Sequence, residues 1–247
     1  MARYLPHPSD LPSDLQAVRR ELQDALVAGV ERVHRHPSSK PGVYVRGTGA
    51  LLMDWKLADL SSELKISPST PSVNRAQFSL LEPSTSGRIS FLETDVGTAT
   101  LIIVEGLRSR SENVPEKAVA LREQAAKVLR SALRVAINEE GKEEECEVLY
   151  GRAGLLYALL LLHAKVAAVS TDPTKGNVED DPLVNAVIQL CSERHIDSLV
   201  HDIISRGKAG AQRYAHNLSA QERDITPPLM WSWHGKRYLG AAHGFGE

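Results

Sequence analysis

Three stretches of the chain carry apolar residues at the three- and four-residue spacing of an amphipathic helix. Residues at their ends are typical helix starts and stops. Ser13 and Gln16 have the spacing of a capping box, Pro115 suits a first helical position, and Gly207 suits a stop. The predicted ranges are about 14–35, 115–138 and 182–207.

Shorter, almost entirely apolar segments alternate with these helices, and each begins at or near a glycine. They start at Gly47, Asp95, Gly151 and, near the end of the sequence, His243. In a double ring of helices only the inner helices are buried on several sides, so only they are apolar all round. The alternation therefore predicts an all-α helical repeat, which we interpret as a single domain over residues 1–247.

Three polar stretches are predicted to be linkers, at residues 67–87, 139–147 and 170–181. The acidic stretch 139–147 is interpreted as a solvated loop without a binding role. The first linker is longer than most loops of compact domains. It is either an insertion without structure or a region where the helix prediction fails.

Composition and charge exclude one class of function. The formal net charge is −2, and the lysines and arginines are scattered rather than clustered. Nucleic-acid backbones are bound by concentrated positive charge. We therefore expect no nucleic-acid partner.

The two cysteines are too few for a disulfide framework, and the amino terminus lacks a secretion signal. A cytoplasmic location is the natural expectation. The apolar run 153–162 is too short for a membrane span, which needs about 20 residues, and is predicted to be a buried helix. Peripheral association with a membrane through a surface patch stays open. No obligate oligomer is expected.

Two motifs are more specific than these patterns. Residues 227–244 read PPLMWSWHGKRYLGAAHG, and residues 146–162 read CEVLYGRAGLLYALLLL. Both resemble signatures of the lanthionine synthetase C-like (LanC-like) family and occur in the family's order. Weaker similarity covers residues 3–8 and 87–97. The resemblance implies an α/α toroid in which seven glycine-led inner helices surround a central site.

The sequence also departs from this family. Four inner-helix starts are present where the resemblance implies seven, so the toroid is expected to be incomplete, as in an amino-terminal portion. The family binds zinc through two cysteines and a histidine in later inner helices, including a Cys-His-Gly segment that this sequence lacks. Cys146 and Cys191 do not have metal-ligand spacing. We therefore assign no metal ligand and expect this chain by itself to be inactive.

The resemblance implies a reaction in which a zinc-bound thiolate adds to the double bond of a dehydrated serine or threonine. Glutathione, or a peptide or protein thiol, is the implied co-substrate. His243 matches the family histidine that protonates the resulting enolate, a role suited to a group that titrates near neutral pH. A lone histidine at a helix start more often only bonds a loop carbonyl, and the match of the surrounding motif reverses that preference.

Three other residues match positions near the family's central cavity. Glu147 is the second candidate catalytic residue, because it could orient the histidine or accept the thiol proton; it could also simply stabilise the following helix dipole. Arg152 and Arg3 are candidate contacts for an anionic substrate. Arg152 could instead cap neighbouring carbonyls. The aromatic residues of 227–244 are predicted to pack rather than to bind a ligand.

Two other functions compete with thiol addition. A non-catalytic helical-repeat module that binds a protein partner would use the apolar faces of an open ring. A toroidal glycosidase would need two carboxylates across a cavity, and Glu147 is the single candidate.

Overall fold

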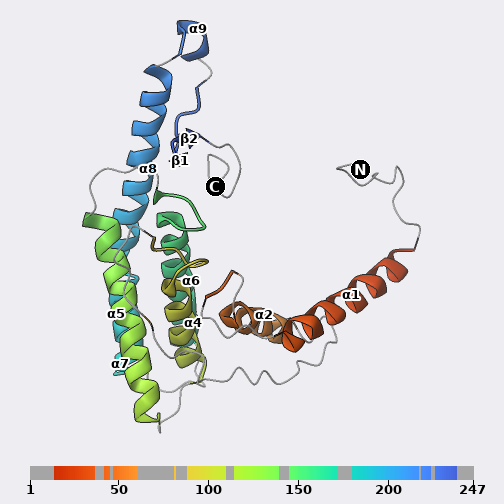
Figure 1. Ribbon diagram of the computed structural model, residues 1–247. Coiled ribbons are helices and arrows are strands. Elements are labelled where there is room, and N and C mark those ends of the chain that lie inside the picture. Colours follow the sequence, from red (N-terminus) through yellow and green to blue (C-terminus); the bar gives the residue numbers. More distant parts are fainter. Residues whose placement is uncertain are drawn as a thin grey trace.

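The computed structural model describes residues 14–36, 42–44, 47–60, 81, 88–109, 114–138, 145–171, 180–216, 218–223 and 226–237. These residues form helices and one short antiparallel strand pair (Figure 1). The elements are α1 (Leu15–Arg35), α2 (Gly47–Asp59), α4 (Asp95–Arg108), α5 (Glu116–Asn138), α6 (Arg152–Ser170), α7 (Pro182–Leu190), α8 (Glu193–His216), α9 (Ala220–Arg223), β1 (Ser232–Trp233) and β2 (Lys236–Arg237). The predicted all-α class is confirmed.

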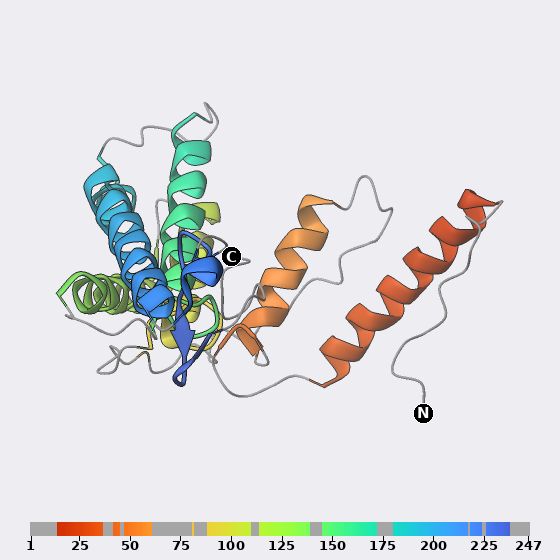
Figure 2. The same cartoon turned by 90° about the horizontal axis from the view of Figure 1, so that it is seen from above.

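Helices α4 to α8 form a bundle around α4, and α2 and α1 extend to one side of it (Figures 1 and 2). Eleven of the fourteen residues of α4 are buried, whereas α1 has no buried residue. The amphipathic helices α5 and α8 pack against the apolar helices α4 and α6. Glycine-led helices therefore lie inside and amphipathic helices outside, as in an arc of an α/α toroid.

One backbone contact is repeated at the start of each of the three described inner helices, α2, α4 and α6. A Cβ atom added to Gly49, Gly97 or Gly154 would overlap the carbonyl oxygen of the residue six positions earlier. These carbonyls belong to Val43, Phe91 and Val148. The chain before each inner helix thus folds back over the first helical turn, and only glycine leaves room for it.

Gly97→Ala tests this contact directly. The added methyl group would overlap the Phe91 carbonyl oxygen and lie 2.7 Å from Cγ2 of Val43. We expect the free energy of unfolding to fall by at least about 3 kcal/mol, the upper end of overpacking costs, in urea denaturation. Gly29→Ala is the control, because nothing lies within 4 Å of its added Cβ. It should change stability by less than about 1 kcal/mol, and equal losses in both variants would contradict the steric explanation.

The first and second amphipathic helices were predicted within a residue or two of their ends, but the N-cap residue of α1 was misassigned. The N-cap is Asp14, whose Oδ1 accepts hydrogen bonds from the backbone N–H groups of Gln16 and Ala17, both at 2.9 Å. Ser13 lies outside the described residues. A carboxylate in the cap position satisfies two of the otherwise unpaired N–H groups of the first turn.

The prediction of one helix over 182–207 is wrong in two respects. The helix breaks at Cys191 and Ser192, where Nδ1 of His195 lies 3.1 Å from the Gln189 carbonyl oxygen and satisfies the end of α7. Gly207 does not stop α8, which continues to His216. The missing side chain of Gly207 instead makes room for the ring of Trp231, whose Cζ2 would lie 2.6 Å from an added Cβ.

The first predicted linker falls mostly outside the described residues. Leu81 is described and is buried, and its carbonyl oxygen accepts a hydrogen bond from Nε2 of Gln124 at 2.8 Å. The fourth inner-helix start, at His243, also lies outside the described part of the chain.

In the described residues one helix, α6, is long and apolar enough to cross a membrane by length and composition. A third of its most apolar window is buried, and Tyr157 and Leu160 are about half exposed, so the prediction of a buried helix is confirmed only in part. In this structure α6 packs against α4, α7 and α8.

Candidate functional site

The segment 145–152, which leads into α6, contains two of the four predicted site residues. Glu147 and Arg152 lie here, within five residues of each other and both buried. Arg3 and His243 lie outside the described residues. Their predicted roles, and their positions relative to Glu147, therefore stay predictions.

A tight turn places these residues. The N–H of Gly151 donates to the Glu147 carbonyl oxygen at 2.9 Å, and the Tyr150 carbonyl oxygen accepts from the N–H of Ile89 at 2.8 Å. A Cβ on Gly151 would lie 2.5 Å from the Glu145 carbonyl oxygen. Glycine at position 151 thus leaves room for the backbone of Glu145 and Glu147 inside the turn.

The carboxylate of Glu147 is 4% exposed and is held by the turn itself. Its two oxygens accept hydrogen bonds from the N–H groups of Leu149 (2.6 Å) and Tyr150 (2.5 Å). A negative charge just before α6 also interacts favourably with the helix dipole. The stabilising role considered for Glu147 is therefore present.

Arg152 is fully buried at the first position of α6. Its Nε lies 2.8 Å from Oδ2 of Asp202 on α8, and its Nη1 lies 3.4 Å from Oε2 of Glu145. Nε and Nη1 also lie within hydrogen-bonding distance of the carbonyl oxygens of Ala136 (3.3 Å) and Glu145 (3.2 Å). Among the described residues, nothing accepts a hydrogen bond from its Nη2. The guanidinium thus joins α5, α6 and α8.

The sequence interpretation did not identify the acidic partners of Arg152. Asp202 bridges two arginines, because its Oδ2 also lies 2.7 Å from Nε of Arg206, one helical turn further on. The solvated-loop interpretation of the acidic stretch is wrong for its last residues, since Glu145 pairs with Arg152 and Glu147 is buried. The available signal for these partners was an arginine at the first position of an otherwise apolar helix, because a buried charge requires a partner.

The two cysteines lie in different surroundings, and burial is the main cause of the pKa shift of both thiols. Burial raises the pKa of Cys146 from 9.0 to about 12, although the nearby guanidinium of Arg152 acts in the opposite direction. Burial also raises the pKa of Cys191 to about 12. Metal ligation requires the thiolate, and no group of three His, Cys, Asp or Glu side chains among the described residues could hold a metal ion. This part of the chain does not fit a zinc site.

These pKa values predict low thiol reactivity. At pH 7 we expect iodoacetamide to modify Cys146 and Cys191 at least about a hundredfold more slowly in the folded chain than in urea, because the folded thiols are neutral and buried. The unfolded thiols ionise more readily, so the stability that they contribute is complete below about pH 9 and is lost as pH rises toward 12. Equal rates with and without urea would show that the thiols are accessible.

Of the aromatic residues that were predicted to pack, Trp231 does so, on α8, whereas the side chains of Trp233 and Tyr238 lie outside the described part of the chain. Nε1 of Trp231 donates a hydrogen bond to the Ile203 carbonyl oxygen at 3.1 Å, and the N–H of Met230 donates to the Gly207 carbonyl oxygen at 2.9 Å. Arg237 lies over the ring of Tyr214 at 5.7 Å from its centre. The segment before the predicted histidine motif is therefore attached to the outer helix α8.

Residues 116–246, more than half of the chain, match the family model described as lanthionine synthetase C-like protein. The match includes Glu147, Arg152 and His243 and leaves out Arg3. No solved structure matches the chain.

Proposed function

Because this chain belongs to the lanthionine synthetase C-like family, we propose that the protein adds a thiol to a dehydrated serine or threonine, with glutathione or a peptide thiol as the nucleophile. The observation that carries the proposal is the family match over residues 116–246, which spans both signature motifs. A thiol substrate needs a reducing environment, so the proposal includes a cytoplasmic location.

The reaction has two proton movements. The thiol loses its proton and its sulfur bonds to the β-carbon of the dehydroamino acid, while the π electrons move toward the α-carbon and carbonyl. The α-carbon then gains a proton. We assign this protonation to His243, which is suited to deliver a proton near neutral pH. Glu147 is the candidate that takes the thiol proton or orients the histidine.

The proposed substrate contacts are Arg3 and Arg152. A glutathione or peptide carboxylate would suit a guanidinium, which binds carboxylates with two parallel hydrogen bonds. The Nη2 group of Arg152, which has no acceptor among the described residues, supports this assignment. The ion pair with Asp202 argues against the assignment, because that carboxylate already compensates most of the charge of the Arg152 guanidinium.

Zinc supplies the thiolate in this family, and the described residues do not provide its ligands. The proposal therefore applies to a form of the protein that carries a Cys-His-Gly segment and a further cysteine. We expect the 247-residue chain by itself to purify with far less than one zinc per chain. Elemental analysis that finds about one tightly held zinc would contradict this and would require a new assignment of Cys146 and Cys191.

The function is tested with glutathione and a peptide containing dehydroalanine. The 247-residue chain and the longest form encoded by its gene are compared by mass spectrometry, and a reaction without protein corrects for spontaneous addition. We expect the long form to accelerate formation of the thioether and the short chain to be inactive. If a long form with the zinc ligands and bound zinc does not accelerate the reaction, the proposed activity is wrong and the protein-interaction alternative is favoured.

A further inference from the structure

Trp231 is held on α8 by hydrogen bonds as well as by packing. Its Nε1 donates to the Ile203 carbonyl oxygen at 3.1 Å, and the N–H of Met230 donates to the Gly207 carbonyl oxygen at 2.9 Å. Both acceptors belong to helix α8 and use a second lone pair for these outside donors. The indole fills the space over Gly207. We call Gly207 and the Ile203 carbonyl the seat of Trp231; together they fix where this segment lies along α8.

The chain after Trp231 turns back and contacts α8 a second time (Figure 1). Strands β1 and β2 pair antiparallel. His234 and Gly235 connect them with φ angles of 49° and 70°, the left-handed pair of a tight hairpin turn. Arg237, at the end of β2, lies over the ring of Tyr214 on α8. The point from which the chain continues beyond the hairpin is therefore set by α8.

The same part of α8 also holds the turn that contains Glu147. Oδ2 of Asp202 lies 2.8 Å from Nε of Arg152 and 2.7 Å from Nε of Arg206. Nη1 of Arg152 in turn lies 3.2 Å from the carbonyl oxygen of Glu145, where the turn begins. The position of this turn thus depends on α8 through a buried guanidinium.

Two neighbouring rows of α8 residues serve these two attachments. Asp202 and Arg206 are four residues apart, and so are Ile203 and Gly207 of the seat. Residues four apart lie above one another on a helix. The two signature motifs of the sequence, 146–162 and 227–244, are therefore joined at one place on an outer helix.

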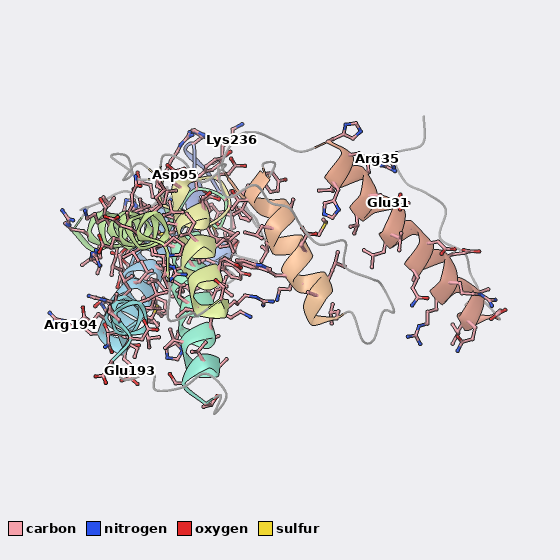
Figure 3. The ribbon with its side chains drawn as sticks, turned by 90° about the horizontal axis from the view of Figure 1, so that it is seen from below. Glu31, Arg35, Asp95, Glu193, Arg194 and Lys236 are labelled. Carbon is pink, nitrogen blue, oxygen red and sulfur yellow. The ribbon has the colours of Figure 1, made fainter. Side chains whose placement is uncertain are left out.

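The hairpin lies on the side of the bundle where the inner helix α4 begins. In the view of Figure 3, Lys236 of the hairpin and Asp95 of α4 are on one side, and Glu193 at the start of α8 is on the other. A backbone hydrogen bond joins the segments that precede α4 and α6. His243 follows Arg237 by six residues, so it lies within about 21 Å of that anchor.

We propose that Trp231 is a positioning residue for the reaction assigned to His243. Its seat fixes the segment that leads to His243 on the part of α8 that also holds Arg152. Where His243 lies relative to Glu147 is then set by this seat. The inference rests on the proposed function, because it requires His243 to deliver a proton. A displacement of about 1 Å in a catalytic group can cost about a hundredfold in rate.

Steady-state kinetics of an active, zinc-containing form test the proposal. Trp231→Phe keeps an apolar ring but removes the hydrogen bond to Ile203. We expect kcat to fall at least about tenfold, while KM for glutathione changes by less than about twofold. Trp55→Phe is the matched control, because Trp55 is also buried, at 9%, but lies on α2. It should leave kcat unchanged.

A double variant separates positioning from a general structural role. In a His243→Ala background, Trp231→Phe should cost no further activity, because it acts only through the histidine. A further loss of the same size in that background would overturn the proposal.

Hydrogen–deuterium exchange of the 247-residue chain tests the positioning without any activity. Trp231→Phe should speed exchange in the peptide 238–246 at least about fivefold, because local opening no longer breaks the indole hydrogen bond. Trp55→Phe should leave this peptide unchanged, and circular dichroism should show equal helix content in all three proteins. Equal exchange in the two variants would overturn the proposal. If exchange responds but a zinc-containing long form does not accelerate thiol addition, the proposed function is wrong, while the seat still holds this segment.

A size exchange tests the seat from the side of α8. Gly207→Ala should speed the same exchange, because an added Cβ would lie 2.6 Å from Cζ2 and 3.1 Å from Nε1 of Trp231. Phenylalanine lacks both atoms, so Gly207→Ala should cost little more when added to Trp231→Phe. Gly29→Ala is the control, since nothing lies within 4 Å of its added Cβ. Unchanged exchange in Gly207→Ala, or additive effects in the double variant, would contradict the seat.

Discussion

Arg152→Met is expected to lower the free energy of unfolding by about 3–5 kcal/mol, the range found when one partner of a buried ion pair is removed. Arg152 is fully buried, and the substitution deprives Glu145 and Asp202 of their shared cation. The Ala136 carbonyl oxygen also loses a donor. Urea denaturation followed by circular dichroism measures the loss.

Two controls identify the ion pair as the cause. Arg134→Met removes an exposed arginine from α5 and should change stability by less than about 0.5 kcal/mol. Arg152→Met should cost less in an Asp202→Asn background, because the two side chains interact directly. Additive losses would mean that Arg152 stabilises the fold through packing alone.

His243→Ala is expected to reduce kcat/KM for thiol addition by about a hundred- to ten-thousand-fold, the usual contribution of general acid–base catalysis. This prediction rests on the proposed function and is measured in a form that is active in the glutathione assay. Zinc content should be unchanged, because the histidine is not assigned as a ligand. Loss of zinc together with activity would make His243 structural, and unchanged turnover would remove it from the mechanism.

Glu147→Gln tests the proposed partnership with His243. If the two residues act as one unit, the double variant should be little slower than His243→Ala alone. The structure requires a further control, because both carboxylate oxygens of Glu147 accept backbone hydrogen bonds and an amide would turn an NH₂ group toward one of those donors. The thermal stability of each variant must therefore be compared before a slower rate is attributed to proton transfer.

Several features were readable from the sequence because their causes are local. The periodicity of apolar residues predicted α1 and α5, since three- and four-residue spacing places side chains on one face of any helix. The glycine-led starts of α2, α4 and α6 were also recognised. Their repeated contact with a carbonyl six residues earlier involves only neighbouring segments of the same chain.

Other features depended on contacts between distant residues. The pairing of Arg152 with Asp202 joins helices 50 positions apart in sequence, and no local spacing indicates that distance. The break between α7 and α8 was missed because no glycine or proline marks it; the available signal was the shift in phase of the apolar residues between 183–188 and 196–204.

For α1 the sequence by itself determined a helix with one apolar face, and the tertiary structure decided that the described residues leave this face open. The same division holds at the start of α6. The sequence determined that Glu147 and Arg152 lie beside an inner helix. Only the folded chain decided that backbone N–H groups bond the carboxylate of Glu147 and that acidic side chains pair with the guanidinium of Arg152. Periodicity specifies which side of a helix avoids water, and packing decides what covers it, because that choice depends on the relative free energies of contacts that the chain makes only when folded.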